Sequence, residues 1–269
     1  MIAKDLNDIQ LLHFPSLSGF HKLNHFVTTR KGGVSTGNYQ GLNLGNGGDD
    51  PQMIAQNQFL LSAALGTSED SIFYCHQTHS ANVRVIDTNF LGLKQEEKQH
   101  LLDDVDAMVT NLSNIHLIIR TADCVPVLLF DPKKKAVAAI HAGWRGTVAR
   151  IACKALEKMQ ANYGSDPRDV LAAIGPSISP DVYEVGPEVC EQFQSTFSFS
   201  EQIIRKKGNG KYMLDLWQAN TKQLLEYGVL DSHIELAGLC TLTQSELFYS
   251  ARRDGVNTGR MGTGISLVE

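Results

Sequence analysis

Residues 121–147, TADCVPVLLFDPKKKAVAAIHAGWRGT, predict two strands joined by a turn, with a cysteine and a histidine at their ends. Residues 125–130 and 136–140 are short apolar runs, and the residues between them are polar. Two such runs joined by a few turn residues are typical of an antiparallel hairpin. With the turn centred near its proline, Cys124 faces His141 or the residue after it, and directly opposed Cβ atoms lie about 5 Å apart. We therefore expect this thiol and imidazole to hold one metal ion or to contact each other.

The rest of the chain mixes helical and strand-like segments without the regular rhythm of a parallel βαβ fold. Helical patterns cover residues 51–65, 147–162, 187–193 and 215–227, and strand patterns cover 71–75, 83–87, 116–120, 170–174, 234–239 and 247–250. The clearest helix begins with Thr147 as its N-cap and ends at Gly164. We expect an α/β fold in a single domain, residues 1–269, with a mixed, antiparallel-rich sheet flanked by helices.

Composition restricts the possible partners of this chain. It has 269 residues, enough for one large domain, and a formal net charge of −5, which argues against a general nucleic-acid binder. The first residues lack the apolar core of a secretory signal, and no stretch is long enough for a membrane span. The five cysteines are scattered without CxxC spacing, as is usual for a reducing compartment. We expect a cytoplasmic monomer or small homo-oligomer with no nucleic-acid or membrane partner.

Cys124 and His141 supply two ligands of a possible metal site. Catalytic zinc usually has three protein ligands and one open position, and the best third donor is the segment that carries His76 and His79. Only one of these two histidines needs to point inward. A mixed Cys–His set suits zinc or copper and does not suit magnesium or calcium. Zinc lowers the pKa of bound water to about 7, which gives a hydroxide able to attack a purine ring carbon or an amide.

A possible anion site follows directly after His141. The residues HAGWRGT predict a strand, a glycine-containing turn and the first turn of a helix. Free backbone N–H groups at a helix N-terminus attract anions, and the forked guanidinium of Arg145 suits phosphate. The spacing differs from that of a Walker loop, and the glycines could equally serve only the turn.

Two further glycine-containing segments carry arginines. Residues 28–45 form a glycine-rich loop with Arg30 and Asn43, and a long loop of this kind is either functional or a mobile part of the surface. Residues 248–262 contain three arginines: Arg252, Arg253 and Arg260. They could clamp an anion, but we favour a structural role in a terminal strand and turn.

A series of segments resembles the laccase-domain family, also known as the multicopper polyphenol oxidase-like or YfiH-like family, whose members are regarded as purine nucleoside phosphorylases. The segments are TTRKGG (28–33), LNLG (42–45) with DDP (49–51), HQTHSANV (76–83), DDVDAMVT (103–110), TADCVPVLLFDP (121–132), HAGWRGT (141–147), IGPSISPDVYEVG (174–186), and CT (240–241) followed by FYSARRDGVNTGR (248–260). They follow the family order over nearly the whole chain, so the set is far more specific than any one segment.

The resemblance implies a single α/β domain with a zinc site of two histidines and one cysteine. The Gln-x-His motif selects His79 rather than His76, and the other two motifs select Cys124 and His141. It also implies phosphorolysis of adenosine, inosine and methylthioadenosine by phosphate, together with adenosine deamination. Three polar motif positions are plausible substrate or phosphate contacts: Arg30, Asn43 and Arg145.

One departure from the family pattern concerns copper. Family members often carry two adjacent cysteines before the tyrosine that corresponds to Tyr183, and here those positions are Asp181 and Val182. Extra copper ions bound by such cysteines are therefore excluded for this chain. Multicopper oxidases also rely on HxH pairs, and none of the nine histidines forms one, although copper in place of zinc stays possible.

Two other functions remain open from the sequence. One is a copper-dependent polyphenol oxidase, or laccase. The other is a metal-free amide hydrolase, for example in peptidoglycan precursor editing, with Cys124 as nucleophile and His141 as base. A non-enzymatic binding module would explain neither the Cys–His pairing nor the cationic loops.

Overall fold

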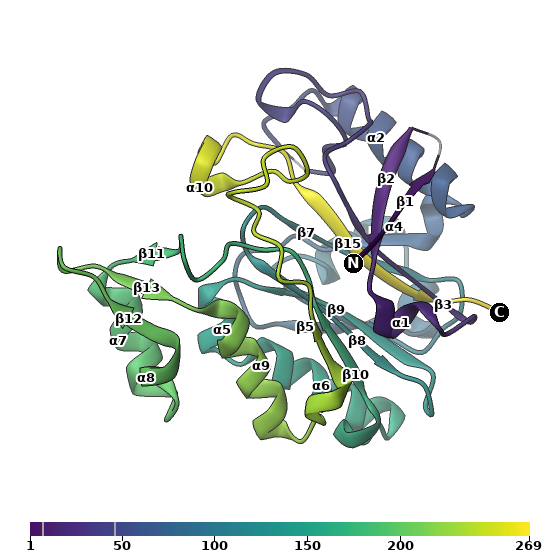
Figure 1. Cartoon of the computed structure of the whole chain (residues 1–269). Coiled ribbons are helices and arrows are strands. Elements are labelled where there is room, and N and C mark those ends of the chain that lie inside the picture. Colours follow the sequence, from purple (N-terminus) through teal and green to yellow (C-terminus); the bar gives the residue numbers. More distant parts are fainter. Residues whose placement is uncertain (7, 46) are drawn as a thin grey trace.

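The computed structural model describes residues 1–6, 8–45 and 47–269, whose strands form two six-stranded sheets and one small three-stranded sheet (Figure 1). The first sheet has the strand order β1-β2-β3-β15-β7-β4, and its last pair, β7 and β4, is parallel while the others are antiparallel. Its strands are β1 (Ile2–Leu6), β2 (Ile9–His13), β3 (Leu23–Thr28), β15 (Met261–Leu267), β7 (His116–Thr121) and β4 (Ile72–Tyr74).

The second sheet contains the hairpin and has the order β14-β10-β8-β9-β6-β5. Its two outer pairs are parallel and the inner strands are antiparallel. Its strands are β14 (Ile234–Leu236), β10 (Leu171–Ile174), β8 (Val125–Asp131), β9 (Ala136–Ala142), β6 (Ala107–Thr110) and β5 (Val83–Val85). The expected α/β fold with mixed, antiparallel-rich strands flanked by helices is confirmed, with the strands divided between two sheets.

A small third sheet and the helices complete the fold. The third sheet, at the left edge of Figure 1, consists of β11 (Glu184–Val185), β13 (Tyr212–Leu214) and β12 (Ile204–Lys206). The α-helices are α1 (Pro15–Ser18), α2 (Pro51–Leu65), α3 (Thr88–Leu91), α4 (Gln95–Leu101), α5 (Trp144–Val148), α6 (Ile151–Tyr163), α7 (Pro187–Thr196), α8 (Ser200–Ile203), α9 (Leu216–Tyr227) and α10 (Ala251–Asp254). No helix in the described ranges is long and apolar enough to cross a bilayer.

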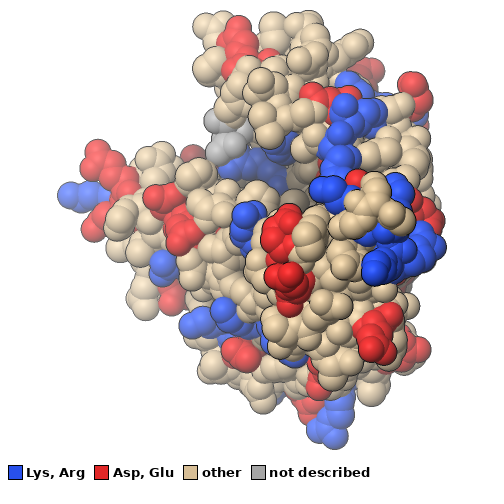
Figure 2. All heavy atoms as spheres, turned by 90° about the vertical axis from the view of Figure 1, so that its left-hand side faces the viewer, with Lys and Arg blue, Asp and Glu red and all other residues tan. Residues whose placement is uncertain are grey.

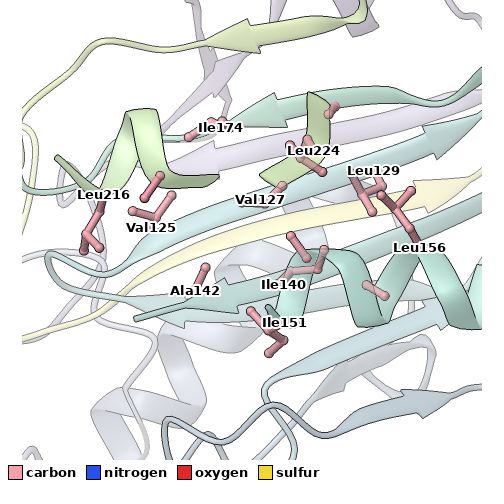
Figure 3. Close-up of a cluster of buried hydrophobic side chains, with 14 of the residues drawn as sticks. Val125, Val127, Leu129, Ile140, Ala142, Ile151, Leu156, Ile174, Leu216 and Leu224 are labelled. Carbon is pink, nitrogen blue, oxygen red and sulfur yellow. The ribbon is translucent and has the colours of Figure 1, made fainter. Parts of the chain in front are cut away.

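Strands β8 and β9 are buried along their whole length because both faces of their sheet are covered. On one face, Val127 and Leu129 pack with residues of α6 and α9 (Figure 3). On the other face, Leu128 packs in a second cluster that includes residues of β7 and β15. Burial on two faces explains why these strands read as continuous apolar runs rather than as an alternating pattern.

The hairpin is confirmed, but its register differs from the expected one. Val125 lies opposite Ala142 and Pro126 lies opposite His141, so Cys124 precedes β8 and is a diagonal neighbour of His141. The prediction that Cys124 directly faces His141 or the residue after it is therefore wrong. The reason is a later turn centre, because the Asp131 carboxylate accepts hydrogen bonds from two backbone N–H groups inside the turn. Diagonal neighbours on one sheet face are still within reach of long side chains.

Two other expected elements differ from the structure: one predicted helix is divided in two, and one predicted strand is absent. The helix predicted for residues 147–162 is divided into α5 and α6, because Arg150 adopts a left-handed conformation with φ of 58°. Thr147 is therefore inside α5 and is not the N-cap of the long helix, whereas Gly164 does cap its C-terminus. The strand predicted for residues 247–250 is absent from the structure there, and the short helix α10 follows.

Candidate metal centre

His79, Cys124 and His141 converge on one point of the structure. One ligand atom of each residue lies within 4.8 Å of the other two, and Sγ of Cys124 is 3.7 Å from Nε2 of His79. A tetrahedral zinc ion with Zn–N bonds of about 2.0 Å and a Zn–S bond of about 2.3 Å places such nitrogen and sulfur atoms about 3.6 Å apart. The donor set and its spacing therefore fit a metal ion of the zinc or copper type.

The three ligands come from different elements. His79 lies in the loop between β4 and β5 with a positive φ of 65°, and Cys124 lies in the turn between β7 and β8. His141 is a buried residue of β9. The rings of the two histidines meet edge to face, with centroids 5.0 Å apart. The structure thus groups His79 with the hairpin, whereas Nδ1 of His76 lies 2.5 Å from the Asp103 carboxylate, outside this cluster.

A single buried carboxylate, that of Asp106, orients two of the three ligands. It lies 2.6 Å from Nδ1 of His141, which leaves Nε2 of that ring free for a metal. It also accepts hydrogen bonds from the backbone N–H groups of Thr78, His79 and Ser80, and so fixes the loop that carries His79. Metal-bound histidines usually have such a partner on the second ring nitrogen, and losing it weakens metal binding.

The charges at the centre are coupled. Burial alone would raise the pKa of the Cys124 thiol, but His141 and His79 beside it lower that pKa below its ordinary value. Burial would lower the pKa of His141, but the sulfur of Cys124 and the Asp106 carboxylate raise it. The arrangement favours a thiolate, which is the form of cysteine that binds metals and acts as a nucleophile.

The cluster opens into a pocket of about 450 Å³, which we call the metal pocket. Three arginines line it: Arg120, Arg252 and Arg260. A small recess of about 80 Å³ adjoins the cluster and is lined by apolar groups that include Trp144, Ile178 and Leu216. Tyr183 borders both spaces. The site therefore combines two histidines and a cysteine with a cationic wall and an apolar recess.

Arg145 is the one predicted substrate contact that lies beside the cluster. Its guanidinium carbon is 4.3 Å from the centre of the Trp144 ring, and both residues line the apolar recess. The helix that begins here, α5, has only five residues, so it provides little of the dipole expected for an anion site.

Arg30 and Asn43, two of the predicted substrate or phosphate contacts, are not among the residues that line the metal pocket. The Arg30 guanidinium donates to the carbonyl oxygens of Ser245 and Gln40 and lines a separate hollow formed by the glycine-rich loop. Asn43 is fully buried, and its side-chain oxygen accepts a hydrogen bond from the backbone N–H of Arg260. Asn43 thus supports a residue of the pocket without reaching the pocket itself.

The arginines of residues 248–262 divide into two groups. Arg253 is structural, as expected: its guanidinium donates to the carbonyl oxygens of Thr241, Leu242 and Phe248. Arg252 and Arg260 instead line the metal pocket.

Two further residues of the site escaped the sequence analysis. Arg120 is the next-to-last residue of β7, a strand that the sequence predicts without a role for this arginine. Asp106 directly precedes β6, a strand that the sequence analysis does not predict. In both cases the available signal was a charged residue at the end of an apolar run.

The fold and the site together define an α/β protein that groups two histidines and a cysteine in a cationic pocket. The chain belongs to the family described as "Multi-copper polyphenol oxidoreductase laccase", whose model matches residues 24–268. The resemblance inferred from the sequence motifs is therefore confirmed.

Individual relatives cover almost the whole chain. It is 43% identical to a protein named purine nucleoside phosphorylase from Bacteroides thetaiotaomicron, over 97% of each chain. It is 40% identical to adenosine deaminase RL5 from an unknown prokaryotic organism, over 89% of this chain and 92% of that one. The crystal structure of YlmD from Geobacillus stearothermophilus superposes with a TM-score of 0.90 at 31% identity, over 99% of this chain and 98% of that one. These names support an enzymatic role.

Proposed function

We propose that this protein is a zinc-dependent purine nucleoside phosphorylase with adenosine deaminase activity. The observation that carries the proposal is the His–Cys–His cluster at the wall of a cationic pocket, in a chain whose relatives bear both enzyme names. The expected substrates are adenosine, inosine and methylthioadenosine together with phosphate. Because the family model and the relatives extend over nearly the full length, we propose that residues 1–269 form one catalytic domain.

In this proposal His79, Cys124 and His141 hold the zinc ion. Bound zinc supplies a Lewis acid that polarises an oxygen or nitrogen atom of the substrate or lowers the pKa of water. Asp106 keeps His141 in the tautomer whose Nε2 faces the metal and holds the loop of His79 in place. The protein thereby presents three ligands without reorganisation when substrate arrives.

The two reactions make different demands on the pocket. In phosphorolysis a phosphate oxygen forms a bond to C1′ of the ribose, the bond from C1′ to N9 breaks, and the base leaves with a proton. In deamination a water oxygen replaces the exocyclic amino group, which leaves as ammonia. The first reaction needs a site for a doubly charged anion, which the arginines of the metal pocket are suited to provide. Arg145 beside the apolar recess remains a candidate for contact with the nucleoside.

The test combines metal analysis with product analysis. Protein purified without added metal is expected to contain about one zinc ion per chain, as a three-ligand catalytic site requires, and His79→Ala is expected to lose it. With adenosine and phosphate, the zinc-loaded protein is expected to form adenine, ribose 1-phosphate and inosine. Absence of all three products would overturn the proposal.

A copper-dependent polyphenol oxidase is the second candidate, because the family description names that activity. Against it, the described part of the chain holds a single group of three or more potential ligands, which is one metal site rather than several. Copper-dependent oxygen uptake with a phenol, lost in Cys124→Ala, would favour this candidate over the first.

A metal-free amide hydrolase is the third candidate, because Sγ of Cys124 lies 3.7 Å from Nε2 of His79 and within 4.8 Å of a ring nitrogen of His141, the base expected from the sequence. Stoichiometric zinc that resists chelators would exclude the hydrolase, because a metal-bound thiolate is not a free nucleophile. Elemental analysis before and after treatment with a chelator measures this.

A further inference from the structure

Two arginines stand on neighbouring strands at one edge of the metal pocket. Arg120 lies near the end of β7, and Arg260 immediately precedes β15. Gly262 is the residue opposite Arg120 in this antiparallel pair, and Arg260 is two positions before it. Residues two apart along a strand share one face, so the two guanidinium groups project from the same side of the sheet. Both line the same pocket as the His–Cys–His cluster.

The positive charge of Arg120 has no acidic partner among the described residues. Its guanidinium donates to the carbonyl oxygen of Cys75 and lies 5.3 Å from the centre of the Tyr74 ring. Burial and the neighbouring charge of Arg260 lower the pKa of Arg120. A buried cation without a counter-ion is costly, so proteins keep such groups where an anion will bind.

The charge of Arg260 is also unneutralised, although its orientation is fixed. Three backbone carbonyl oxygens, those of Val256, Thr258 and Gly259, accept hydrogen bonds from its guanidinium. No carboxylate in the described chain lies within ion-pair distance of it. Burial lowers the pKa of Arg260, and both Arg260 and Cys124 line the metal pocket.

The acidic residue that lines the pocket, Asp123, is engaged elsewhere. Its carboxylate accepts hydrogen bonds from the hydroxyl groups of Thr241 and Ser250 and from the backbone N–H of Arg252. It therefore supports the wall of the pocket rather than pairing with an arginine side chain.

Figure 2 shows that the face turned toward the viewer is hollowed, with Lys and Arg side chains gathered in and around the hollow.

We propose that Arg120 and Arg260 together bind the inorganic phosphate that is consumed in phosphorolysis. The inference rests on the proposed function. Two forked cations on one sheet face can each donate two hydrogen bonds to a phosphate dianion, and the anion restores the charge balance of the pocket. The arginines form no covalent bond. They hold phosphate while its oxygen bonds to C1′ and the bond from C1′ to the base breaks. Deamination uses water in place of phosphate and does not require this pair.

The experiment separates the two reactions in the same holoenzyme. Arg120→Gln and Arg260→Gln are each expected to raise the KM for phosphate about 10-fold or more, the usual effect of losing a charge-assisted hydrogen bond, with the deamination rate changed less than about 2-fold. Arg260→Lys, which keeps the charge without the fork, is expected to fall between wild type and Arg260→Gln. Arg168→Gln is the matched control, because Arg168 pairs with Asp166 at an exposed site away from the pocket.

Direct titration with inorganic phosphate gives an independent reading of the same site. The zinc-loaded wild type is expected to bind phosphate in the absence of nucleoside, and both glutamine variants are expected to bind it more weakly. An unchanged KM for phosphate in both variants, or an equal loss of phosphorolysis and deamination, would overturn the inference. If the wild type performs neither reaction, the proposed function fails, and the titration still decides whether this pair binds phosphate. If Arg120→Gln does not fold, Arg260→Gln and Arg260→Lys carry the test.

Discussion

Two hollows on this protein are lined by arginines, and they differ in what surrounds the positive charge. The hollow of the glycine-rich loop measures about 800 Å³, against about 450 Å³ for the metal pocket. In the larger hollow Arg30 donates to two carbonyl oxygens and lies over the Tyr249 ring, and within the described residues it forms no ion pair with a carboxylate. In the metal pocket Arg120 and Arg260 likewise form no ion pair with a described carboxylate, but they adjoin the cluster of His79, Cys124 and His141, which could hold a metal ion. Volume and arginine content therefore do not distinguish the two hollows; the convergence of two histidines and a cysteine does.

The largest effect is expected from removal of a metal ligand. Cys124→Ala removes the thiolate of the cluster, so we expect the zinc content to fall to near zero and phosphorolysis to decrease by about 1,000-fold or more. Arg30→Gln, in the other hollow, is expected to keep the metal and to retain activity within about 2-fold, because ion pairs and hydrogen bonds at half-exposed sites contribute little. Elemental analysis measures the zinc content of the two variants, and initial rates measure their phosphorolysis. Equal losses in the two variants would remove the distinction between the hollows.

A smaller effect is expected when the ligands remain but lose their support. Asp106→Asn keeps the size of the side chain and replaces the acceptor that faces His141 and three backbone N–H groups. We expect zinc affinity to fall about 10- to 100-fold, the range typical of such outer partners. Competition with a chelator measures the affinity. Affinity equal to that of the wild type would show that the cluster does not depend on this carboxylate.

Asn43 connects the glycine-rich loop to the metal pocket. Its side chain is fully buried, accepts hydrogen bonds from the backbone N–H groups of Gly45 and Arg260, and donates to Asp49. We expect Asn43→Ala to lower the free energy of unfolding by about 1–3 kcal/mol, because buried partners are left unpaired. Because Arg260 is then held less firmly, the KM for phosphate is expected to rise as well. Denaturant unfolding and phosphate kinetics together check this; a loss of stability with unchanged kinetics would limit Asn43 to the scaffold.

The last effect concerns the pH dependence of stability and histidines of the scaffold, whose charge behaviour is opposite to that of His141. Burial lowers the pKa of His25 and of His116 to about 4 in the folded protein, whereas the unfolded chain titrates near 6.5. Protonation therefore favours the unfolded state: this contribution to stability is complete above pH of about 6.5 and is lost as the pH falls toward about 4. Denaturant unfolding between pH 7.5 and 4.5 measures the decline. His116→Leu is expected to make it shallower, and an unchanged slope would contradict the assignment.

The sequence predicted best those elements whose own residues mark their extent, such as an apolar run, a turn, a proline or a glycine. Strands β8 and β9 were predicted because two short apolar runs flank a polar turn. Helix α2 was predicted because Pro51 and Gly66 mark its two ends, and the structure begins and caps it at those residues. Cys124 and His141 could be paired from this local pattern alone, although the expected register differs from the observed one by one or two residues.

Most strands of the first sheet were not predicted, because their residues fit a strand only in contact with neighbouring strands and carry no strand pattern of their own. Strand β15 contains Gly262 and Gly264, and glycine normally weakens a strand prediction. Here the glycines leave room for neighbouring side chains: a Cβ on Gly264 would lie 2.5 Å from the Phe26 ring. Arg120 and Arg260 lie near each other because β7 and β15 are neighbours, and no local pattern predicts that two strands so far apart in the chain lie side by side. The break at Arg150 was likewise unpredictable, since a left-handed arginine has no local signature.

We propose that the metal pocket, rather than the larger hollow, holds zinc and carries out phosphorolysis. The most direct measurement is the formation of ribose 1-phosphate from adenosine and phosphate by protein that carries a measured amount of zinc. We predict that ribose 1-phosphate appears in an amount equal to the sum of adenine and hypoxanthine, at a rate proportional to the zinc content. Zinc-loaded protein that releases no ribose 1-phosphate from adenosine, inosine or methylthioadenosine would contradict the account.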